Sequence, residues 1–500
     1  MFKKILIANR GEIAVRVIRA CREMGIRSVA VYSEVDRAAP HVRLADEARP
    51  VGPAAAAESY LSIQRILEAA RASGAEAIHP GYGFLSENPA FARACTDAGV
   101  VFVGPSAASM ELMGSKTAAR QAMIAAGVPV VPGSAEPLAD LSDARREAAR
   151  CGYPVLVKAA AGGGGKGMRL VEREEDLPAA LREAASEAER AFRDGRLYIE
   201  KYLAAPRHIE IQVLGDRHGR LIHLGERECS LQRRHQKVVE ECPSPLAAAR
   251  PEMRAALGET AVRAARAAAY HNAGTVEFLV DSGGRCYFLE MNTRLQVEHP
   301  VTEWVTGVDL VQEQVRIAAG EPLAYRQDQI QWRGAAIECR VYAEDPDNNF
   351  FPSPGRITRL AEPSGPGVRV DSGASPGWNV PLEYDPLIAK LAVWAPDRPA
   401  ALARLRRALH EYHIEGIKTN LGFFRQILDS ADFEAGRLDT GFIERWLAAR
   451  APVADSAPAQ EQAAALAAVL HSLRYPGNGA APVPGPSSGW KAEGRKSLLR

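Results

Sequence analysis

The sequence lacks the features that mark several large classes of protein. Its seven cysteines are scattered and include no Cys-x-x-Cys pair, so neither a redox disulfide nor a cysteine-ligated metal is predicted. No apolar run approaches the roughly 20 residues of a membrane span. The apolar run at the N-terminus stops at Asn9, short of the roughly 7–15 residues that a signal peptide needs. We therefore expect a reduced, cytoplasmic chain that makes no contact with a membrane.

The sequence also lacks an excess of charge of either sign. The formal net charge is +1, which gives no general argument for binding nucleic acid or an anionic membrane. The chain has 500 residues, which is too many for one compact core. Two to four domains of roughly 100–200 residues each are expected.

The N-terminal part alternates between strand and helix patterns. Such alternation predicts an α/β domain with a parallel sheet. The expected strands span residues 3–8, 27–33, 76–79 and 100–104, and the expected helices span residues 12–24, 59–73 and 88–98. The turn at residues 9–11 does not match Gly-x-Gly-x-x-Gly, so dinucleotide binding is not inferred.

The segment 79–88 follows the end of one of these strands, where open α/β sheets bind ligands. Its glycines allow a close approach of the backbone to a ligand, and Tyr82 offers a flat face. The alternative is a simple turn between strand and helix in which the tyrosine packs against the core.

A glycine-rich loop lies in what we expect to be a second, smaller α/β unit. A predicted helix at 106–126 carries Lys116, a break follows at 127–133, and a strand at 153–158 ends in Lys158. Four consecutive glycines at 162–165 and a fifth at 167 favour a mobile loop whose N–H groups close over phosphates. The loop is not a Walker A motif, because that motif requires Ser or Thr at position 167. A flexible surface linker is the alternative.

Two further segments predict ligand contacts. The strand at 197–203 contains the residues 200–203, whose backbone and side chains could bind the edge of an adenine. The segment 206–213 alternates, which places His208, Glu210 and Gln212 on one face. Residues 225–237 are rich in charge but lack the interleaved aromatic residues of a single-strand binding surface. We interpret them as a small anion site formed by His235 and Lys237.

The strongest local pattern is a hairpin with carboxylates on both strands. An apolar strand at 274–280 carries Glu277, a turn follows at 281–284, and the second arm begins at Phe288. In a strand, Glu290, Asn292 and Arg294 project to the same side. Glu277, Glu290 and Asn292 offer the hard oxygen ligands that suit Mg²⁺, and Arg294 would bind an anion beside them. The alternative is an amphipathic hairpin with a solvated charged face.

A third α/β or α+β domain is expected after residue 331. Strands are predicted at 335–343, 368–370 and 384–394, and a helix at 398–410. Arg340 lies in the middle of the first strand, where a charge is costly unless it binds an anion or forms a structural ion pair. Beyond residue 450 the chain is rich in Ala, Pro, Gly and Ser, with a predicted helix at 461–473 and expected disorder from residue 476.

Taken together, residues 2 to about 447 resemble the biotin carboxylase subunit, an ATP-grasp enzyme, of biotin-dependent acyl-CoA carboxylases such as acetyl-CoA carboxylase. The resemblance rests on the motifs Ile7-Ala-Asn-Arg-Gly-Glu-Ile-Ala14, His79-Pro-Gly-Tyr-Gly-Phe-Leu-Ser-Glu-Asn88, residues 162–168, Gln232-Arg-Arg-His-Gln-Lys237, Glu290-Met-Asn-Thr-Arg-Leu-Gln-Val-Glu298 and Glu338-Cys-Arg340. It implies a Rossmann-like parallel-sheet domain at 1–113, an ATP-grasp domain at 114–330 with a mobile lid at about 132–203, and an α+β domain at 331–448. The residues 449–500 would form a low-complexity tail.

The resemblance implies an ATP- and bicarbonate-dependent carboxylation of biotin through carboxyphosphate, with a role for each matching residue. ATP would be held by Lys116, Lys158, Gly164, Gly165, Glu200, Lys201, Tyr202, Leu203, His208 and His235. Mg²⁺ or Mn²⁺ would be held by Glu277, Glu290 and Asn292. Bicarbonate would be bound by Lys237, Arg294, Gln296 and the backbone of Val297, with Glu298 as its general base. Arg340 would stabilise the biotin enolate, and Tyr82 would line the biotin pocket.

The sequence departs from the pattern of larger family members in two respects. It contains no Met-Lys-Met carrier signature, and it is too short to include a carboxyltransferase domain. A biotin carboxyl carrier protein and carboxyltransferase subunits are therefore expected as partner chains, unless the chain is a fragment. Family members often form homodimers. Acetyl-, propionyl- and 3-methylcrotonyl-CoA all remain open as the final acceptor.

Two rival functions remain. The first is another ATP-grasp ligase that forms carbamoyl phosphate or joins a carboxylate to an amine. Residues 232–237 together with Arg340 argue against it, because such a ligase would not need them. The second is a non-catalytic scaffold that recruits a carboxylase complex. The presence of every charged residue named above argues against a scaffold.

Overall fold

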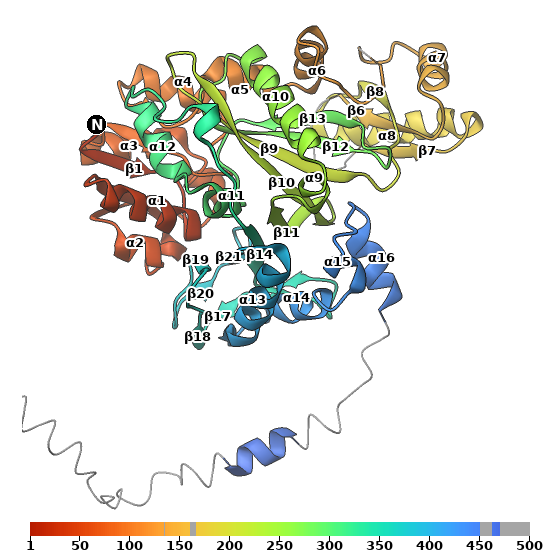
Figure 1. Cartoon of the computed structure of the whole chain (residues 1–500). Coiled ribbons are helices and arrows are strands. Elements are labelled where there is room, and N and C mark those ends of the chain that lie inside the picture. The colour runs from red at the N-terminus through yellow and green to blue at the C-terminus, as the bar shows by residue number, and fades with distance from the viewer. Residues whose placement is uncertain (135, 161–166, 451–462, 471–500) are drawn as a thin grey trace, which may run out of the picture. The chain divides into compact units, whose positions relative to one another are not determined.

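The computed structural model describes residues 1–134, 136–160, 167–450 and 463–470. The chain divides into two compact units, Met1–Arg445 and Trp446–Arg500, and all the sheets lie in the first (Figure 1). In the second unit, residues 463–470 are helical, which confirms that part of the helix predicted at 461–473. The disorder predicted from residue 476 concerns residues outside the described part of the chain.

The N-terminal region forms the predicted parallel sheet. Its strands lie in the order β3 (Glu47–Gly52), β2 (Arg27–Ser33), β1 (Lys4–Ile7), β4 (Ala77–His79) and β5 (Val101–Phe102). The helices α1 (Gly11–Glu23), α2 (Pro40–Leu44), α3 (Ile63–Ser73) and α4 (Pro89–Asp97) connect or flank them. The two faces of the sheet contribute to two separate apolar cores, one containing Ile5 and Ile7 and the other Leu6.

Two local predictions in this region were wrong. The strand β3 was missed, because it lies at the edge of the sheet and carries Pro50 and charged residues, which is typical of edge strands. The single helix predicted at 106–126 is two helices, α5 (Ala107–Gly114) and α6 (Lys116–Ala125). The helix restarts because the Ser115 hydroxyl accepts the Ala118 backbone N–H as an N-cap.

A long antiparallel sheet of eight strands runs through the rest of the first unit. The strand order is β13 (Cys286–Asn292), β12 (Asn272–Val280), β9 (Arg207–Gly215), β10 (Leu221–Arg233), β11 (Gln236–Cys242), β14 (Ala335–Tyr342), β21 (Leu387–Ala395) and β19 (Val368–Ser372). The sheet is continuous from β11 to β14, so it crosses the predicted domain boundary at residue 330. Residues of the predicted second and third domains therefore belong to one continuous sheet.

Helices cover this long sheet. The helix α10 (Pro251–Ala267) packs on β9, β10 and β12, and together with α6 it closes an apolar core that includes Ile211 and Phe278. The helices α11 (His299–Thr306), α12 (Leu310–Ala318) and α13 (Arg398–Glu411) also lie against strands of this sheet. The smaller helices are α9 (Pro245–Ala248), α14 (Leu421–Ile427), α15 (Ala431–Glu434) and α16 (Phe442–Ala449).

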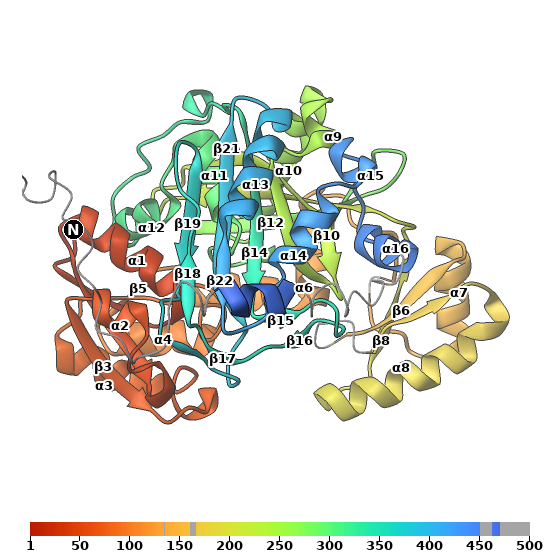
Figure 2. The same cartoon turned by 90° about the horizontal axis from the view of Figure 1, so that it is seen from below.

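A small antiparallel sheet forms the predicted smaller α/β unit. It contains β7 (Arg169–Val171), β6 (Val155–Ala159) and β8 (Leu197–Lys201). The helices α7 (Leu141–Cys151) and α8 (Leu177–Phe192) close its own apolar core, which is rich in alanine. Figures 1 and 2 show this small sheet and the N-terminal parallel sheet on different sides of the long sheet. The third region of the chain adds three two-stranded pairs. They are β15 (Glu344–Asp345) with β16 (Phe351–Pro352), β17 (Gly355–Arg356) with β20 (Asn379–Val380), and β18 (Arg359–Ala361) with β22 (His413–Glu415).

The parallel-sheet domain contacts the far end of the long sheet directly. The loop after β19 approaches the start of α1 so closely that a Cβ on Gly373 would lie 2.6 Å from the backbone nitrogen of Glu12. Tyr384, from the third region of the chain, donates a hydrogen bond to the Ser33 hydroxyl of the first. The start of α1 therefore lies beside β19 and β21.

Candidate active site

A cavity of about 740 Å³ lies between the small sheet and the long sheet. Its walls come from β6 and β8 on one side and from β9, β12 and β13 on the other, with the β10–β11 turn and Arg340 of β14 at one end. A second cavity of about 420 Å³ shares Lys116, Lys158, Glu200 and Glu290 with it. We call the larger cavity the cleft.

The structure brings together nearly all the site residues that the sequence predicted. The following predicted residues line the cleft: Lys116, Lys158, Glu200, Lys201, Tyr202, Leu203, His208, His235, Lys237, Glu277, Glu290, Asn292, Arg294, Gln296, Val297, Glu298 and Arg340. Gly164 and Gly165 lie outside the described residues, so the structure does not address their predicted role.

Tyr82 is not brought to the cleft. Its ring packs against the apolar core formed by α1 and α12, and the Lys390 Nζ lies 5.7 Å from the ring centroid. Asn9 holds this segment by donating to the backbone oxygens of Pro80 (2.7 Å) and Tyr82 (2.8 Å). The packed tyrosine matches the alternative considered for segment 79–88, and its role in a biotin pocket stays a prediction.

The end of the cleft near Arg340 holds a carboxylate between two cations. Glu298, at the start of α11, accepts a hydrogen bond from the Lys237 Nζ through Oε1 (2.8 Å) and from the Arg340 Nη2 through Oε2 (2.8 Å). Lys237 also contacts Glu210 and Glu277, and Arg340 pairs with Glu240 (2.6 Å). The sequence separations are 61 and 42 residues, so only the sheet and the following loop bring these groups together.

The charges in this cluster set the protonation of Glu298. Burial acts to raise the pKa of Glu298, but Lys237, Arg340 and Arg227 outweigh it and hold that pKa well below its usual range. Burial acts to lower the pKa of Lys237, and the carboxylates of Glu210, Glu277 and Glu298 raise it well above its usual range. At neutral pH the cluster therefore consists of an ionised base and protonated cations.

The predicted hairpin forms, and it places two carboxylates side by side. Glu277 of β12 and Glu290 of β13 are cross-strand partners, and Thr275 is the partner of Asn292. The Asn292 side chain donates to Glu277 Oε1 (2.8 Å). Burial raises the pKa of Glu290, and repulsion from Glu277 raises it further. A pair of repelling carboxylates with an amide oxygen nearby fits a hard divalent cation.

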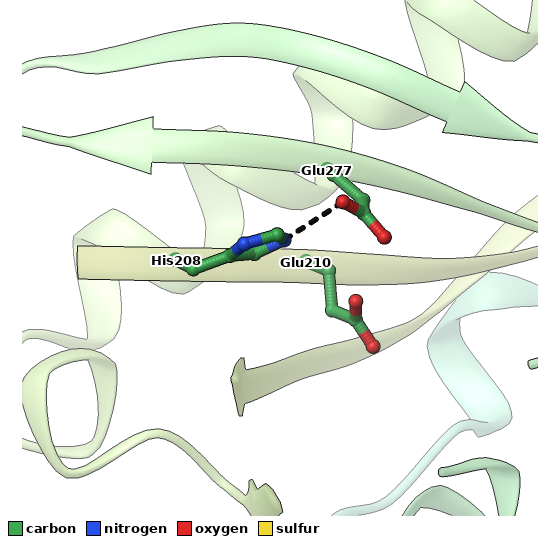
Figure 3. Close-up of side chains that lie close together, drawn as sticks. All are labelled: His208, Glu210 and Glu277. Atoms are coloured by element: carbon green, nitrogen blue, oxygen red, sulfur yellow. Dashed lines mark ion pairs between the residues drawn. The ribbon is translucent and has the colours of Figure 1, made fainter. Parts of the chain in front are cut away.

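A second set of ligand atoms lies next to this pair. His208, Glu210 and Glu277 each offer one ligand atom, and these atoms all lie within 4.8 Å of one another (Figure 3). In Figure 3, the His208 ring points at Glu277, with Nε2 at 2.8 Å from Oε2, and the Glu210 side chain lies below this pair. Glu210 is already paired with Arg227 and Lys237, so a metal there would have to displace a cation.

The opposite end of the cleft carries the lysines predicted to meet phosphates. Lys158 pairs with Glu200 across β6 and β8 at 2.5 Å, and Arg120 lies 3.4 Å from the same carboxylate. Burial lowers the pKa of Lys116, and the nearby Lys158 adds to the effect. The Lys201 Nζ donates to the backbone oxygens of Gly152 and Tyr153, so its side chain is held by the segment between α7 and β6.

Three charged residues at the site were missed by the sequence analysis. Arg227 lies beneath the cleft and is fully buried; Glu240 pairs with Arg340; Glu87 accepts a hydrogen bond from the Arg294 Nε (2.7 Å). The signal for Arg227 was the charge-rich segment 225–237, which is in fact the end of the long strand β10 and the start of β11. Glu87 lies in the segment 79–88, but nothing in the sequence connects it with Arg294.

Known protein families match the chain in three consecutive parts. Residues 1–110 match the family model "Biotin carboxylase, N-terminal domain", residues 115–326 match "Carbamoyl-phosphate synthase L chain, ATP binding domain", and residues 338–445 match "Biotin carboxylase C-terminal domain".

Curated relatives extend over nearly the whole matched region. The chain is 53% identical over 444 residues to a biotin carboxylase of Nostoc sp., covering 89% of this chain and 99% of the relative. It is 54% identical over 446 residues to one of the pyruvate carboxylase subunits of Methanothermobacter thermautotrophicus, covering 89% and 90%. It is 52% identical over 443 residues to the mitochondrial α subunit of methylcrotonoyl-CoA carboxylase of Mus musculus, covering 88% of this chain and 61% of that protein.

Solved structures agree with these relatives. A biotin carboxylase from Campylobacter jejuni, described as a β-γ-ATP complex, superposes with a TM-score of 0.85 at 49% identity over 89% of this chain and 99% of that one. The biotin carboxylase domain dimer of Hydrogenobacter thermophilus 2-oxoglutarate carboxylase gives 0.84 at 51% identity over 89% and 98%. That crystal contains MgADP, ADP and bicarbonate.

The small sheet faces the long antiparallel sheet across a cleft lined by lysines and carboxylates. This arrangement and these matches define an ATP-grasp ligase. The chain belongs to the biotin carboxylase family and has its three-domain fold. Within the described residues, no helix is both long enough and apolar enough to cross a membrane.

Proposed function

We propose that this chain carboxylates biotin on a carrier protein, using ATP and bicarbonate, as the first half-reaction of a biotin-dependent carboxylase. The observation that carries the proposal is Glu298, which lies in the cleft between Lys237 and Arg340. An ionised carboxylate flanked by two cations suits the deprotonation of a small anion and the stabilisation of the product charge.

In this proposal the two ends of the cleft hold different parts of the reactants. Lys116, Lys158, His208, His235 and the segment Glu200, Lys201, Tyr202 and Leu203 bind ATP, with Gly164 and Gly165 closing over the phosphates. Glu277, Glu290 and Asn292 hold Mg²⁺ or Mn²⁺, which would neutralise phosphate charge during transfer. The 2-oxoglutarate carboxylase domain that binds MgADP supports this assignment.

Bicarbonate binds near Lys237, Arg294, Gln296 and the backbone of Val297. The Glu298 carboxylate takes the proton of bicarbonate, whose oxygen then attacks the terminal phosphorus of ATP, forming carboxyphosphate and releasing ADP. In the structure Arg294 is paired with Glu87, so bicarbonate and Glu87 would share this guanidinium. When Lys237 and Arg340 also interact with the bound anion, they stabilise the Glu298 carboxylate less. The pKa of Glu298 then rises, which makes it a better base.

The carboxyl group then moves from carboxyphosphate to the ring nitrogen of biotin, and inorganic phosphate leaves and takes the N–H proton of biotin. Arg340 stabilises the negative oxygen that biotin carries once this proton is lost. The carrier, the carboxyltransferase subunits and a homodimeric state are further parts of the proposal. The dimer is supported by the 2-oxoglutarate carboxylase domain, whose crystal is described as a dimer. The relatives include subunits of pyruvate, 2-oxoglutarate and methylcrotonoyl-CoA carboxylases, so an acyl-CoA acceptor stays a prediction. We keep the boundaries 1–113, 114–330 and 331–448 as proposed domain limits.

The test is phosphate release from MgATP by the purified chain, with and without bicarbonate and free biotin. We expect release that requires bicarbonate and is stimulated by biotin. In Arg340→Met, the stimulation by biotin should fall by more than roughly tenfold, because the oxygen of biotin loses its cation. The matched control is Arg398→Met, which removes an arginine that pairs with Glu241 outside the cleft (2.6 Å). Release that ignores biotin in the unmodified chain would point to another acceptor, such as an amine.

Replacing Lys158 at the nucleotide end of the cleft should change the affinity for ATP. Lys158→Met is expected to weaken ATP binding by roughly tenfold, about 1.4 kcal/mol, because one cation facing the phosphates is lost. Isothermal titration with MgATP measures the change. Lys418→Met is the control, because Lys418 forms an exposed ion pair with Asp345 away from the cleft. Equal affinities in all three proteins would remove Lys158 from the nucleotide site.

The small sheet should respond to nucleotide as a lid. We expect slower amide hydrogen exchange in β6 and β8, and in the loop at 162–167, when ATP is added, because closure shields their backbone. Residues 162–166 of this loop lie outside the described part of the chain. Exchange in α10, which packs behind the long sheet, should not change. Unchanged exchange in the small sheet would argue against a moving lid.

A further inference from the structure

A buried lysine lies directly behind the proposed base. Lys390 is in the middle of β21 and has only 1% of its surface exposed. On the neighbouring strand its cross-strand partner is Arg340, one of the two cations that hold Glu298. Lys390 is not among the residues that line the cleft, so it lies behind the cleft wall.

The ammonium group of Lys390 joins three regions of the chain. It donates a hydrogen bond to the backbone oxygen of Val297 (2.9 Å), in the loop that carries the site. It lies 3.3 Å from a carboxylate oxygen of Glu12 in α1 and 3.8 Å from one of Asp371 in β19. Its three neighbours therefore come from the parallel-sheet domain, the site loop and the far end of the long sheet.

The contact with Val297 acts on the backbone of Glu298. The Val297 carbonyl belongs to the peptide bond that leads directly into the Cα of Glu298, and Glu298 is the residue before the first turn of α11. The side chain of Glu298 is held by Lys237 and Arg340, which a substrate would also attract. Lys390 lies behind the cleft wall, so its hydrogen bond to the Val297 oxygen would persist when substrate enters.

A purely structural ion pair would not need a lysine at this position. Burying a charge is costly, and an apolar side chain of similar volume packs as well or better in many proteins. Glu12 is a poor counter-ion, because burial raises its pKa to about 7 even though Lys390 and other charges act in the opposite direction. Asp371 has a lowered pKa, but it is bound by Arg369 at 2.7 Å and lies farther from Lys390, at 3.8 Å. The hydrogen bond that Lys390 donates to the Val297 backbone oxygen is an interaction that an apolar side chain could not make.

We propose that Lys390 is a positioning residue for the bicarbonate step: it fixes the peptide bond between Val297 and Glu298 and thereby sets the place of the Glu298 carboxylate in the cleft. The inference rests on the proposed function, because it concerns the base of that reaction. A displacement of about 1 Å in a reacting group can cost on the order of a hundredfold in rate. Nucleotide binding, which uses the opposite end of the cleft, should not depend on Lys390.

The experiment compares Lys390→Met with Glu12→Gln and the unmodified chain. In Lys390→Met, bicarbonate-dependent phosphate release should fall by roughly ten- to a hundredfold, while MgATP affinity measured by titration stays within about threefold. Glu12→Gln removes a neighbour of Lys390 but keeps the hydrogen bond to Val297, so both quantities should match the unmodified chain. If Lys390→Met does not fold, Lys390→Gln, which keeps an N–H donor, should show the same split with a smaller loss.

Two results would overturn the inference. One is a folded Lys390→Met variant whose bicarbonate-dependent release is unchanged. The other is a loss of release that is matched by an equal loss of ATP affinity, in Lys390→Met or in Lys390→Gln, because that would show general structural damage. Failure of the proposed function is a separate outcome, since it would appear in the unmodified chain as phosphate release that requires neither bicarbonate nor biotin.

Discussion

Glu298→Gln should lower bicarbonate-dependent phosphate release by roughly 10²–10⁴-fold, because the amide cannot accept the proton of bicarbonate. The amide oxygen still accepts one of the two hydrogen bonds. Lys237 keeps its contacts with Glu210 and Glu277, and Arg340 keeps its pair with Glu240. The assay is phosphate release at saturating MgATP over a range of bicarbonate concentrations. MgATP affinity should change little, because Glu298 lies away from the lysines of the nucleotide end.

The matched control is Glu303→Gln, in the same helix α11. Glu303 is also buried and also held by two cations, at 3.0 Å from Arg16 and 2.7 Å from Arg369, but it does not line the cleft. It should retain phosphate release even though it loses stability. If the two variants lost activity equally, the effect would be one of folding, and Glu298 would not be the base.

Arg227→Met should destabilise the protein by about 3–5 kcal/mol, because it leaves buried acceptors without their donor. The fully buried guanidinium donates to Glu210, Gln212 (2.7 Å), Thr302 (3.0 Å), Thr275 (3.0 Å) and Gln296 (2.8 Å). These acceptors come from β9, β12, the site loop and α11, so one side chain ties together the floor of the cleft. The measurement is the thermal unfolding midpoint, which should fall by several degrees.

Arg254→Met provides the comparison for this prediction. Arg254 of α10 forms an ion pair through two hydrogen bonds with Glu226 (2.7 and 2.8 Å), which lies next to Arg227 on β10. The Arg254 side chain, however, is 20% exposed. Water can replace part of its contribution, so its loss should cost clearly less. Equal shifts in the midpoint would show that the floor of the cleft does not depend on Arg227.

The sequence predicted those parts of the fold whose signal is local. The alternation of strands and helices gave the parallel sheet at the N-terminus, and the turn at 281–284 gave the hairpin that pairs Glu277 with Glu290. Local signals failed where the cause was not local. The edge strand β3 resembles a loop because it carries Pro50 and charged residues, and the helix break at Ser115 needed a capping bond that a serine does not always make.

The candidate site divides in the same way. The family resemblance pointed to Lys237, Arg294, Glu298 and Arg340. For Arg340 there was a further reason, because a charge in the middle of an apolar strand must have a partner or a ligand. Neither reason showed which charges meet. Arg227, Glu87 and Lys390 each act through a partner that lies 15 or more residues away, at a distance that no sequence spacing encodes.

The sequence by itself determined the family, the order of the three regions and the chemical types of the site residues, since each depends on residue identity and short-range pattern. Only the tertiary structure decided that one eight-stranded sheet runs from the hairpin to β19, that Glu298 bridges Lys237 and Arg340, and that Lys390 lies behind it. The physical reason is that strand pairing and buried ion pairs are set by packing between distant segments, where the cost of removing charge from water leaves few arrangements that satisfy every group.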